Sequence, residues 1–186
     1  MLRKGFSRWS KTALSTEEKF ADGKQSPASL QRILIGGIGG FISVASLALL
    51  VDALPQLELL LIGSFGASAV LLFGAPYAPF SQPRNVLGGH LVSALVGILC
   101  YTYLPALPGL QEGAAVGLAT ILMLLTRTMH PPGGATGLIA VIGSEYLHAL
   151  GWKYLLLVAM GMGVLLLLAL IINNLVKPGS YPQRWD

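Results

Sequence analysis

The apolar sequence of this chain is interrupted at residues 126–137 by a stretch that a membrane helix should not tolerate. The stretch contains an arginine, a histidine, two prolines and two glycines, followed by small residues: Arg127, His130, Pro131, Pro132, Gly133, Gly134, Ala135 and Thr136. Proline cannot donate a backbone hydrogen bond and disfavours the α conformation in the residue before it, so a helix arriving through the arginine should end near the histidine. The glycines let the backbone turn or approach a ligand, after which a new helix can begin. The sequence therefore predicts a broken helix, with an ordinary loop at the membrane surface as the alternative.

The composition places the chain in a membrane. Hydrophobic residues make up 54% of the 186 residues and charged residues 11%, with a mean hydropathy of +0.69. Soluble domains usually have about 25% charged residues. The net charge of +4 does not indicate a nucleic-acid partner, because seven of the 12 Lys and Arg residues precede the first apolar run and act as a topology signal.

The sequence lacks the common motifs of catalysis and metal binding. It has no G-x-S-x-G, no carboxylate pair and no zinc-binding pattern, and the one acidic residue inside an apolar run, Glu58, lies at its edge. Cys100 is the single cysteine, and the three histidines have no cysteine or carboxylate at ligand spacing. We therefore expect neither an enzyme nor a bound metal or other cofactor.

The hydropathy pattern predicts an all-α integral membrane protein with about six membrane segments. They cover residues 33–51, 57–74, 86–104, 113–129, 131–143 and 154–175. The first, third and last are long enough to cross a hydrocarbon core of about 30 Å, whereas the second and fifth are broken or half-length. A polar basic tail (1–32) precedes this membrane domain (33–176), and a short tail (177–186) follows it.

A shift of 68 residues aligns the two broken segments with each other. Gly66-Ala67-Ser68-Ala69-Val70-Leu71-Leu72 then lies over Gly134-Ala135-Thr136-Gly137-Leu138-Ile139-Ala140, with two identities and serine facing threonine. Each match is the middle segment of a group of three, in the repeats 33–104 and 113–175. Because three crossings is an odd number, the second group would enter from the opposite side, which predicts an inverted repeat.

The distribution of charge supports six crossings with the N-terminus in the cytoplasm. Basic residues then fall on the inner side, namely the N-terminal tail, Arg84, Arg127, Lys177 and Arg184. Asp52, Glu58, Glu112 and Glu145 fall on the outer side, with Lys153 as the basic exception. This pattern follows the positive-inside rule. In the alternative, both broken segments are re-entrant and only four spans remain.

The two broken segments supply a predicted anion-binding site at the amino ends of short helices. The residues are Ser64, Gly66, Ala67 and Ser68 in the first repeat and Gly134, Ala135 and Thr136 in the second. The amino end of a helix carries about half a positive charge and free N–H groups, and so binds anions. Two opposed ends would hold a small anion near the midplane without a buried full charge.

Three ionisable residues are candidates for the same site. Arg127 is a candidate for the entrance gate or first contact with the anion, with an interfacial anchor as the alternative. His130 can donate to the anion or take up a proton that accompanies it, or it can cap the helix. His90, inside an apolar span, is a candidate for proton transfer or gating, with a packing role as the alternative.

Three motifs in order carry a resemblance to a known family. They are Phe65–Phe73, Gln82–His90 and Arg127–Thr136, which contains the triplet His130-Pro131-Pro132. Over roughly residues 32–175 the chain resembles the HPP family of integral membrane proteins, usually described with four membrane helices. Members in cyanobacteria and plant chloroplasts are associated with nitrite transport. The resemblance thus implies a nitrite carrier in a plasma or thylakoid-type membrane.

Other functions remain open at this point. An anion channel, a non-transporting scaffold and an accessory subunit of a larger complex all fit the hydropathy pattern. The small-residue row Gly89, Ser93 and Gly97 predicts close helix packing, either within the chain or in a homo-oligomer.

Overall fold

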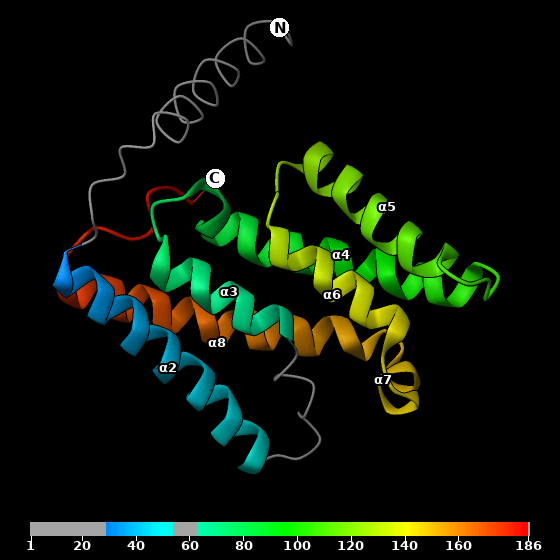
Figure 1. The fold of residues 1–186 in the computed structure, drawn as a ribbon, viewed down its shortest axis with the longest axis horizontal. Helices are drawn as coiled ribbons and strands as arrows, with labels where there is room; N and C mark the ends of the chain where they lie inside the picture. The colour runs from blue at the N-terminus through cyan, green and yellow to red at the C-terminus, as the bar shows by residue number, and fades with distance from the viewer. Residues whose placement is uncertain (1–28, 54–62, 186) are drawn as a thin grey trace, which may run out of the picture. The chain divides into compact units, whose positions relative to one another are not determined.

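The computed structural model describes residues 29–53 and 63–185. Within these ranges the chain forms seven α-helices, one 3-10 turn and no strand. The elements are α2 (Leu30–Ala53), α3 (Gly63–Gly74), η2 (Pro79–Ser81), α4 (Pro83–Tyr103), α5 (Leu110–Thr126), α6 (Pro131–Ile142), α7 (Glu145–Leu150) and α8 (Lys153–Val176) (Figure 1). The predicted tail up to residue 28 and Glu58 lie outside the described residues.

Six of these helices are apolar and match the predicted segments. Three of them, α2, α4 and α8, are long enough to cross a membrane, and three, α3, α5 and α6, are shorter. The prediction of an all-α membrane protein is therefore confirmed. The middle helices α3 and α6 have 12 residues each, half the 24 residues of α2 and of α8. The short helix α7 was not predicted from the hydropathy pattern.

Helix α6 begins at Pro131, the first residue of the predicted segment 131–143, and not after the glycines as expected. His130 is its N-cap residue, with φ −144° and ψ 102°, and Pro131 and Pro132 occupy the first helical positions. Proline suits these positions because its fixed φ is helical and the missing N–H has no intrahelical partner there. Gly133 N donates to His130 O at 2.8 Å. The expectation of free N–H groups at residues 134–136 is wrong, because these residues lie inside the helix.

The same correction applies to α3. Residues 66–68, expected to open a helix, lie inside α3, which already includes Gly63. Their backbone N–H groups therefore belong to the helix interior. Neither predicted amino end provides free backbone donors to an anion at the residues named from the sequence.

Hydrogen bonds between helix ends show which ends lie together. Arg32 at the start of α2 donates to Phe73 O at the end of α3, and Arg84 at the start of α4 donates to Thr126 O at the end of α5 at 3.1 Å. Asn173 near the end of α8 donates to Leu72 O at 3.2 Å. Successive helices therefore alternate in direction (Figure 1).

The two ends of the helices differ in charge. Among the described residues, the end at which α2 and α4 begin carries Arg32, Arg84, Arg127, Lys177 and Arg184, while Asp52, Glu112, Glu145 and Lys153 lie at the opposite end.

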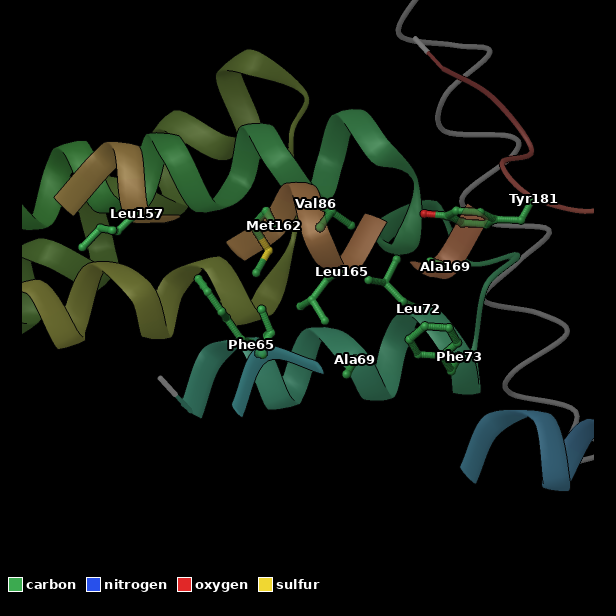
Figure 2. Close-up of a cluster of buried hydrophobic side chains, with 11 residues drawn as sticks. Phe65, Ala69, Leu72, Phe73, Val86, Leu157, Met162, Leu165, Ala169 and Tyr181 are labelled. Atoms are coloured by element: carbon green, nitrogen blue, oxygen red, sulfur yellow. The ribbon is translucent and has the colours of Figure 1, made fainter. Parts of the chain in front are cut away.

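The largest buried apolar cluster joins α3 to α8. Figure 2 shows Phe65 and Leu72 of α3 facing Met162 and Leu165 of α8. The same cluster includes Ala69 and Phe73 of α3, Leu157 and Ala169 of α8, Val86 of α4 and Tyr181. On α3 these residues recur at helical spacing, so that one face packs on α8. Inside a bilayer such contacts stabilise through close packing, since lipid tails are as apolar as leucine.

Helices α4 and α6 pack through glycines. A Cβ built on Gly133 would lie 2.8 Å from Gly89 O, and one on Gly97 would lie 2.3 Å from Gly137 O. A Cβ on Gly137 would lie 2.8 Å from Ser93 O. The row of small residues predicted on α4 is therefore a contact inside the chain, where only glycine allows the two backbones to approach so closely.

The C-terminal segment covers the loop between α3 and α4. Tyr181 Oη donates to Ser81 O at 2.7 Å, and the backbone N–H of Gln183 donates to Gln82 Oε1 at 2.8 Å. Gln82 Nε2 in turn donates to Pro76 O at 3.0 Å and Ala78 O at 2.9 Å. These bonds fix the loop that carries Phe80, whose carbonyl reaches the site described next.

Candidate functional site

Five polar side chains from three helices meet in the interior. They are Ser64 and Ser68 of α3, His90 of α4, and His130 and Thr136 at the start of α6, here called the buried cluster. Ser64 is 1% exposed and the other four are fully buried. All five were named from the sequence as candidates. Buried polar groups at this depth are costly unless they are hydrogen-bonded, so their mutual contacts hold the short helices together.

His90 is at the centre of the buried cluster. Its Nε2 lies 2.8 Å from Ser68 Oγ, and its Nδ1 lies 2.7 Å from Thr136 Oγ1. Thr136 Oγ1 donates to Ser64 Oγ at 2.8 Å. The ring of Phe65 meets the imidazole edge to face, at 5.6 Å between centroids. His90 is thus bonded at both nitrogens and held by an aromatic wall.

His130 extends the cluster towards the loop before α4. Its Nε2 lies 2.9 Å from Ser68 Oγ, and its Nδ1 lies 2.7 Å from Phe80 O. The two imidazole rings are 4.9 Å apart between centroids. His130 is the N-cap residue of α6, but its side chain makes no capping hydrogen bond. The sequence alternative of a capping side chain is therefore wrong.

The local sequence explains why these side chains meet. Ser64 and Ser68 are four residues apart and so share one face of α3, and Ser68 Oγ donates to Ser64 O at 2.9 Å. Gly89 precedes His90 and lets α6 lie against α4 at this level. The extended φ and ψ of His130, which the following proline favours, turn its ring into the bundle.

The two hydroxyls matched by the sequence repeat contact opposite sides of one ring. Ser68 and Thr136 are aligned by the shift of 68 residues, and they bond to Nε2 and Nδ1 of His90 respectively. Helices α3 and α6 run antiparallel here, because Ser64 faces Thr136 while Ser68 faces His130.

Other predicted residues lie outside the buried cluster. Arg127 is exposed at the C-cap of α5, where its φ of 57° and ψ of 40° are left-handed. Ala67 and Ala135 are exposed, and Gly66 and Gly134 are half-buried. A Cβ on Gly134 would meet nothing within 4 Å, so the close backbone contact expected from this glycine pair belongs to Gly133 alone.

Sequence reasoning missed three groups that support the cluster. Phe80 contributes only its carbonyl, and a backbone acceptor leaves no sequence signal. Tyr154 Oη of α8 donates to Thr136 O at 3.1 Å, and Asn85 Nδ2 donates to Met129 O at 2.9 Å. Tyr154 opens the predicted segment 154–175 and Asn85 lies in the motif Gln82–His90, but neither position in the sequence indicates a contact with the cluster.

The buried cluster has no metal-binding composition. No group of three or more His, Cys, Asp or Glu side chains suited to a metal ion occurs among residues 29–53 and 63–185. The partners of the two rings are hydroxyls and one carbonyl, with no carboxylate among them. What this arrangement offers is a set of hydrogen-bond donors and acceptors that can exchange partners and move a proton.

Comparison with known proteins gives one family and two relatives. The family model described as "HPP, transmembrane region" matches residues 25–182. Two Dictyostelium discoideum proteins named only as transmembrane proteins are each 41% identical, over 90% and 72% of this chain. The chain spans 56% and 48% of the length of these relatives. No solved structure matches the chain.

Proposed function

The chain belongs to the HPP family of transmembrane proteins, and we propose that it transports a small inorganic anion across the membrane, with nitrite as the first candidate. The observation that carries this proposal is the contact of Ser68 and Thr136 with the two nitrogens of His90. Equivalent positions of the sequence repeat thus bring hydroxyl groups to one point inside an apolar bundle. Nitrite comes from the resemblance to family members associated with its transport.

The buried cluster suits a small anion that must be released again. Hydroxyl and imidazole N–H groups donate to anionic oxygens, and bonds to a charged acceptor are stronger than neutral ones. In the described arrangement Ser64, Ser68 and Thr136 bond to one another or to the histidines. An anion takes over these bonds when the donors turn towards it. Because no lysine or arginine is among the bonding partners of the cluster, binding is not so tight that release fails.

The proposed movement separates α3 from α6. The two helices meet through Ser64 with Thr136 and Ser68 with His130, so an anion inserted between them replaces contacts that each helix already makes. We propose that the two three-helix groups form an inverted repeat of six crossing segments and rock against each other around the cluster. This is the usual basis of alternating access in carriers with such repeats.

The basic end of the helices is proposed to face the cytoplasm. The described charges there are all basic, which follows the positive-inside rule. Arg127 is exposed at this end, where it is a first contact for an anion approaching from the cytoplasm. Steering of this kind acts at long range and is weakened by salt.

A non-transporting role as a membrane scaffold is the second candidate. It is favoured because each member of the buried cluster is already hydrogen-bonded inside the chain. In a scaffold these bonds would only hold the short helices in place. A measurement of flux separates the two candidates.

Counterflow in liposomes that contain only this protein tests anion transport. Liposomes loaded with unlabelled nitrite, nitrate, chloride or formate should take up labelled nitrite, and nitrite inside should stimulate uptake most. Thr136→Val keeps the shape but removes the hydroxyl that contacts His90, so uptake should fall about tenfold or more, the equivalent of one net hydrogen bond to a charged group. Thr120→Val is the matched control, because Thr120 Oγ1 donates only to Val116 O of its own helix. Absence of counterflow for all four anions would exclude the transport proposal and favour the scaffold.

A further inference from the structure

We propose that His90, Ser68 and His130 together bind one proton, and that this proton crosses the membrane with the anion. The inference rests on the proposed anion transport for the second part, but the proton site itself is argued from the hydrogen-bond geometry alone. It makes the protein an anion and proton symporter that carries no net charge for a monovalent anion.

A line of contacts runs through the buried cluster. Its members in order are the Phe80 carbonyl, His130, Ser68, His90, Thr136 and Ser64, joined by contacts of 2.7, 2.9, 2.8, 2.7 and 2.8 Å. Each contact needs one hydrogen to be a bond. A neutral imidazole carries one N–H and a hydroxyl carries one O–H.

The neutral cluster is at least one hydrogen short of these five contacts. Each ring, Ser68 and Thr136 can supply one hydrogen, which makes four at most, because Thr136 donates to Ser64 and Ser68 can instead donate to the Ser64 carbonyl. The carbonyl of Phe80 can only accept, so Nδ1 of His130 must carry that ring's single hydrogen. Nε2 of neutral His130 then presents a lone pair to Ser68 Oγ. Either tautomer of His90 leaves at least one of the five contacts without a hydrogen.

One added proton completes the line. With a hydrogen on Nε2 of His130 as well as on Nδ1, every contact from Phe80 to Ser64 holds one hydrogen. Ser68 Oγ then accepts from His130 and donates to Nε2 of His90, whose Nδ1–H points to Thr136. Without the proton, the Ser68 hydroxyl has another acceptor in the Ser64 carbonyl of its own helix, at 2.9 Å.

The proton can pass between the two rings through Ser68. The Nε2–H bond of His130 breaks as its hydrogen moves to Ser68 Oγ, while the Ser68 hydrogen forms a new bond to Nε2 of His90. No atom changes place other than these hydrogens, and the positive charge moves from one ring to the other. His130 borders the loop at the basic end of the helices, and His90 lies inside α4. The transfer therefore carries positive charge from that loop towards the interior of the helix bundle.

Among the described residues, the hydrogen-bond partners of the two rings include no charged side chain. The groups facing them are the hydroxyls of Ser64 and Ser68 and the ring of Phe65 from α3, the Phe80 carbonyl from η2, and Thr136 from α6, with the Tyr154 hydroxyl of α8 behind Thr136. A positive charge in such surroundings is unfavourable unless a counter-charge comes with it. An anion supplies that counter-charge, which couples the two ions.

The first experiment measures the driving force for uptake. In liposomes with the membrane potential clamped, an interior more alkaline than the exterior should drive nitrite accumulation, and an imposed potential should not. Protein-free liposomes correct for leakage of nitrous acid. His130→Gln should lose accumulation driven by the pH gradient, whereas His148→Gln, outside the cluster, should keep it. Accumulation that follows the potential and ignores the pH gradient overturns the proton proposal and leaves anion transport standing.

The second experiment counts hydrogens without reference to transport. In ¹⁵N NMR of histidine-labelled protein in bilayers, the pair of rings should gain one hydrogen between about pH 9 and about pH 4, shared between both rings. Ser68→Ala removes the bridge and should separate the two titrations. A pair that gains no hydrogen, or gains hydrogens in the same way with and without Ser68, overturns the proposal. If no anion shows counterflow, the proposed function fails and this measurement alone decides the proton site.

Discussion

If the protein transports the anion as proposed, replacing His90 with phenylalanine should abolish uptake, whereas the same replacement of His148 should leave it unchanged. Phenylalanine keeps a flat ring but accepts and donates nothing, so Ser68 and Thr136 each lose their bond to the imidazole and keep only their bonds to Ser64 and His130. A hydrogen bond contributes about 0.5–1.5 kcal/mol, and one to a charged group about 1.5–3 kcal/mol. We expect uptake to fall at least ~100-fold, since one imidazole donor to the anion and the proton path are removed together.

His148 is a matched control for this change. Its ring stacks on Tyr101 at 3.7 Å between centroids, which phenylalanine can also do, and its Nε2 contacts Val141 O near the other end of α6. Uptake is measured by nitrite counterflow in liposomes with equal amounts of folded protein. Uptake by His90→Phe within twofold of the unchanged protein would remove the buried cluster from the transport mechanism.

We expect Gly133→Ala to disrupt the site and Gly134→Ala next to it to leave it intact. A Cβ on Gly133 would lie 2.8 Å from both the carbonyl carbon and the carbonyl oxygen of Gly89 and 3.2 Å from the backbone nitrogen of His90. These are backbone atoms, which cannot turn aside as a side chain can, so α6 must move away from α4. Overpacking of this kind costs about 1–3 kcal/mol. The displacement also stretches the 2.7 Å contact between His90 and Thr136, so uptake should fall about 10-fold or more.

The neighbouring substitution separates this effect from a general loss of helix packing. A Cβ on Gly134 would meet nothing within 4 Å, and alanine is favoured over glycine inside a helix by about 0.5–1 kcal/mol. We expect Gly134→Ala to keep full uptake and an equal or higher thermal midpoint in detergent. If both variants keep full uptake, or both lose it, the close contact at Gly133 does not explain the result and the prediction is wrong.

Much of the fold follows from patterns that the sequence displays directly. Long apolar runs predict α2, α4 and α8, and the two interrupted runs predict the short helices α3 and α6. The shift of 68 residues also paired Ser68 with Thr136, which meet at His90. These features could be found because hydrophobic length and spacing are local properties of the sequence.

The start of each short helix could not be found in the same way. Two prolines in succession were expected to keep the helix from beginning before the glycines, yet Pro131 and Pro132 occupy the first helical positions. Proline ends a helix that arrives and also suits the first turn of one that begins, so the sequence allows both outcomes. The proposed anion site therefore consists of side chains and not of the backbone N–H groups expected from the sequence.

The orientation of side chains also depends on contacts distant in sequence. Gly133 and Gly134 look alike in the sequence, and only the position of α4 shows that one is in close contact and the other is not. Arg127 was a candidate for the entrance gate or for an interfacial anchor, and its exposed position at the end of α5 is compatible with both. The link from His130 to the Phe80 carbonyl joins residues 50 positions apart.

The central claim is that a small anion binds at the buried cluster, and the distance between that anion and the histidine rings tests it most directly. Solid-state NMR of the protein in bilayers, with ¹⁵N-labelled nitrite and ¹³C-labelled histidine, measures the dipolar coupling between the two. The account predicts coupling at hydrogen-bonding range, ~3–4 Å between nitrite and ring atoms, for His90 and His130 and none for His148. Nitrite that is bound and exchanged by the protein but couples to neither His90 nor His130 would contradict it.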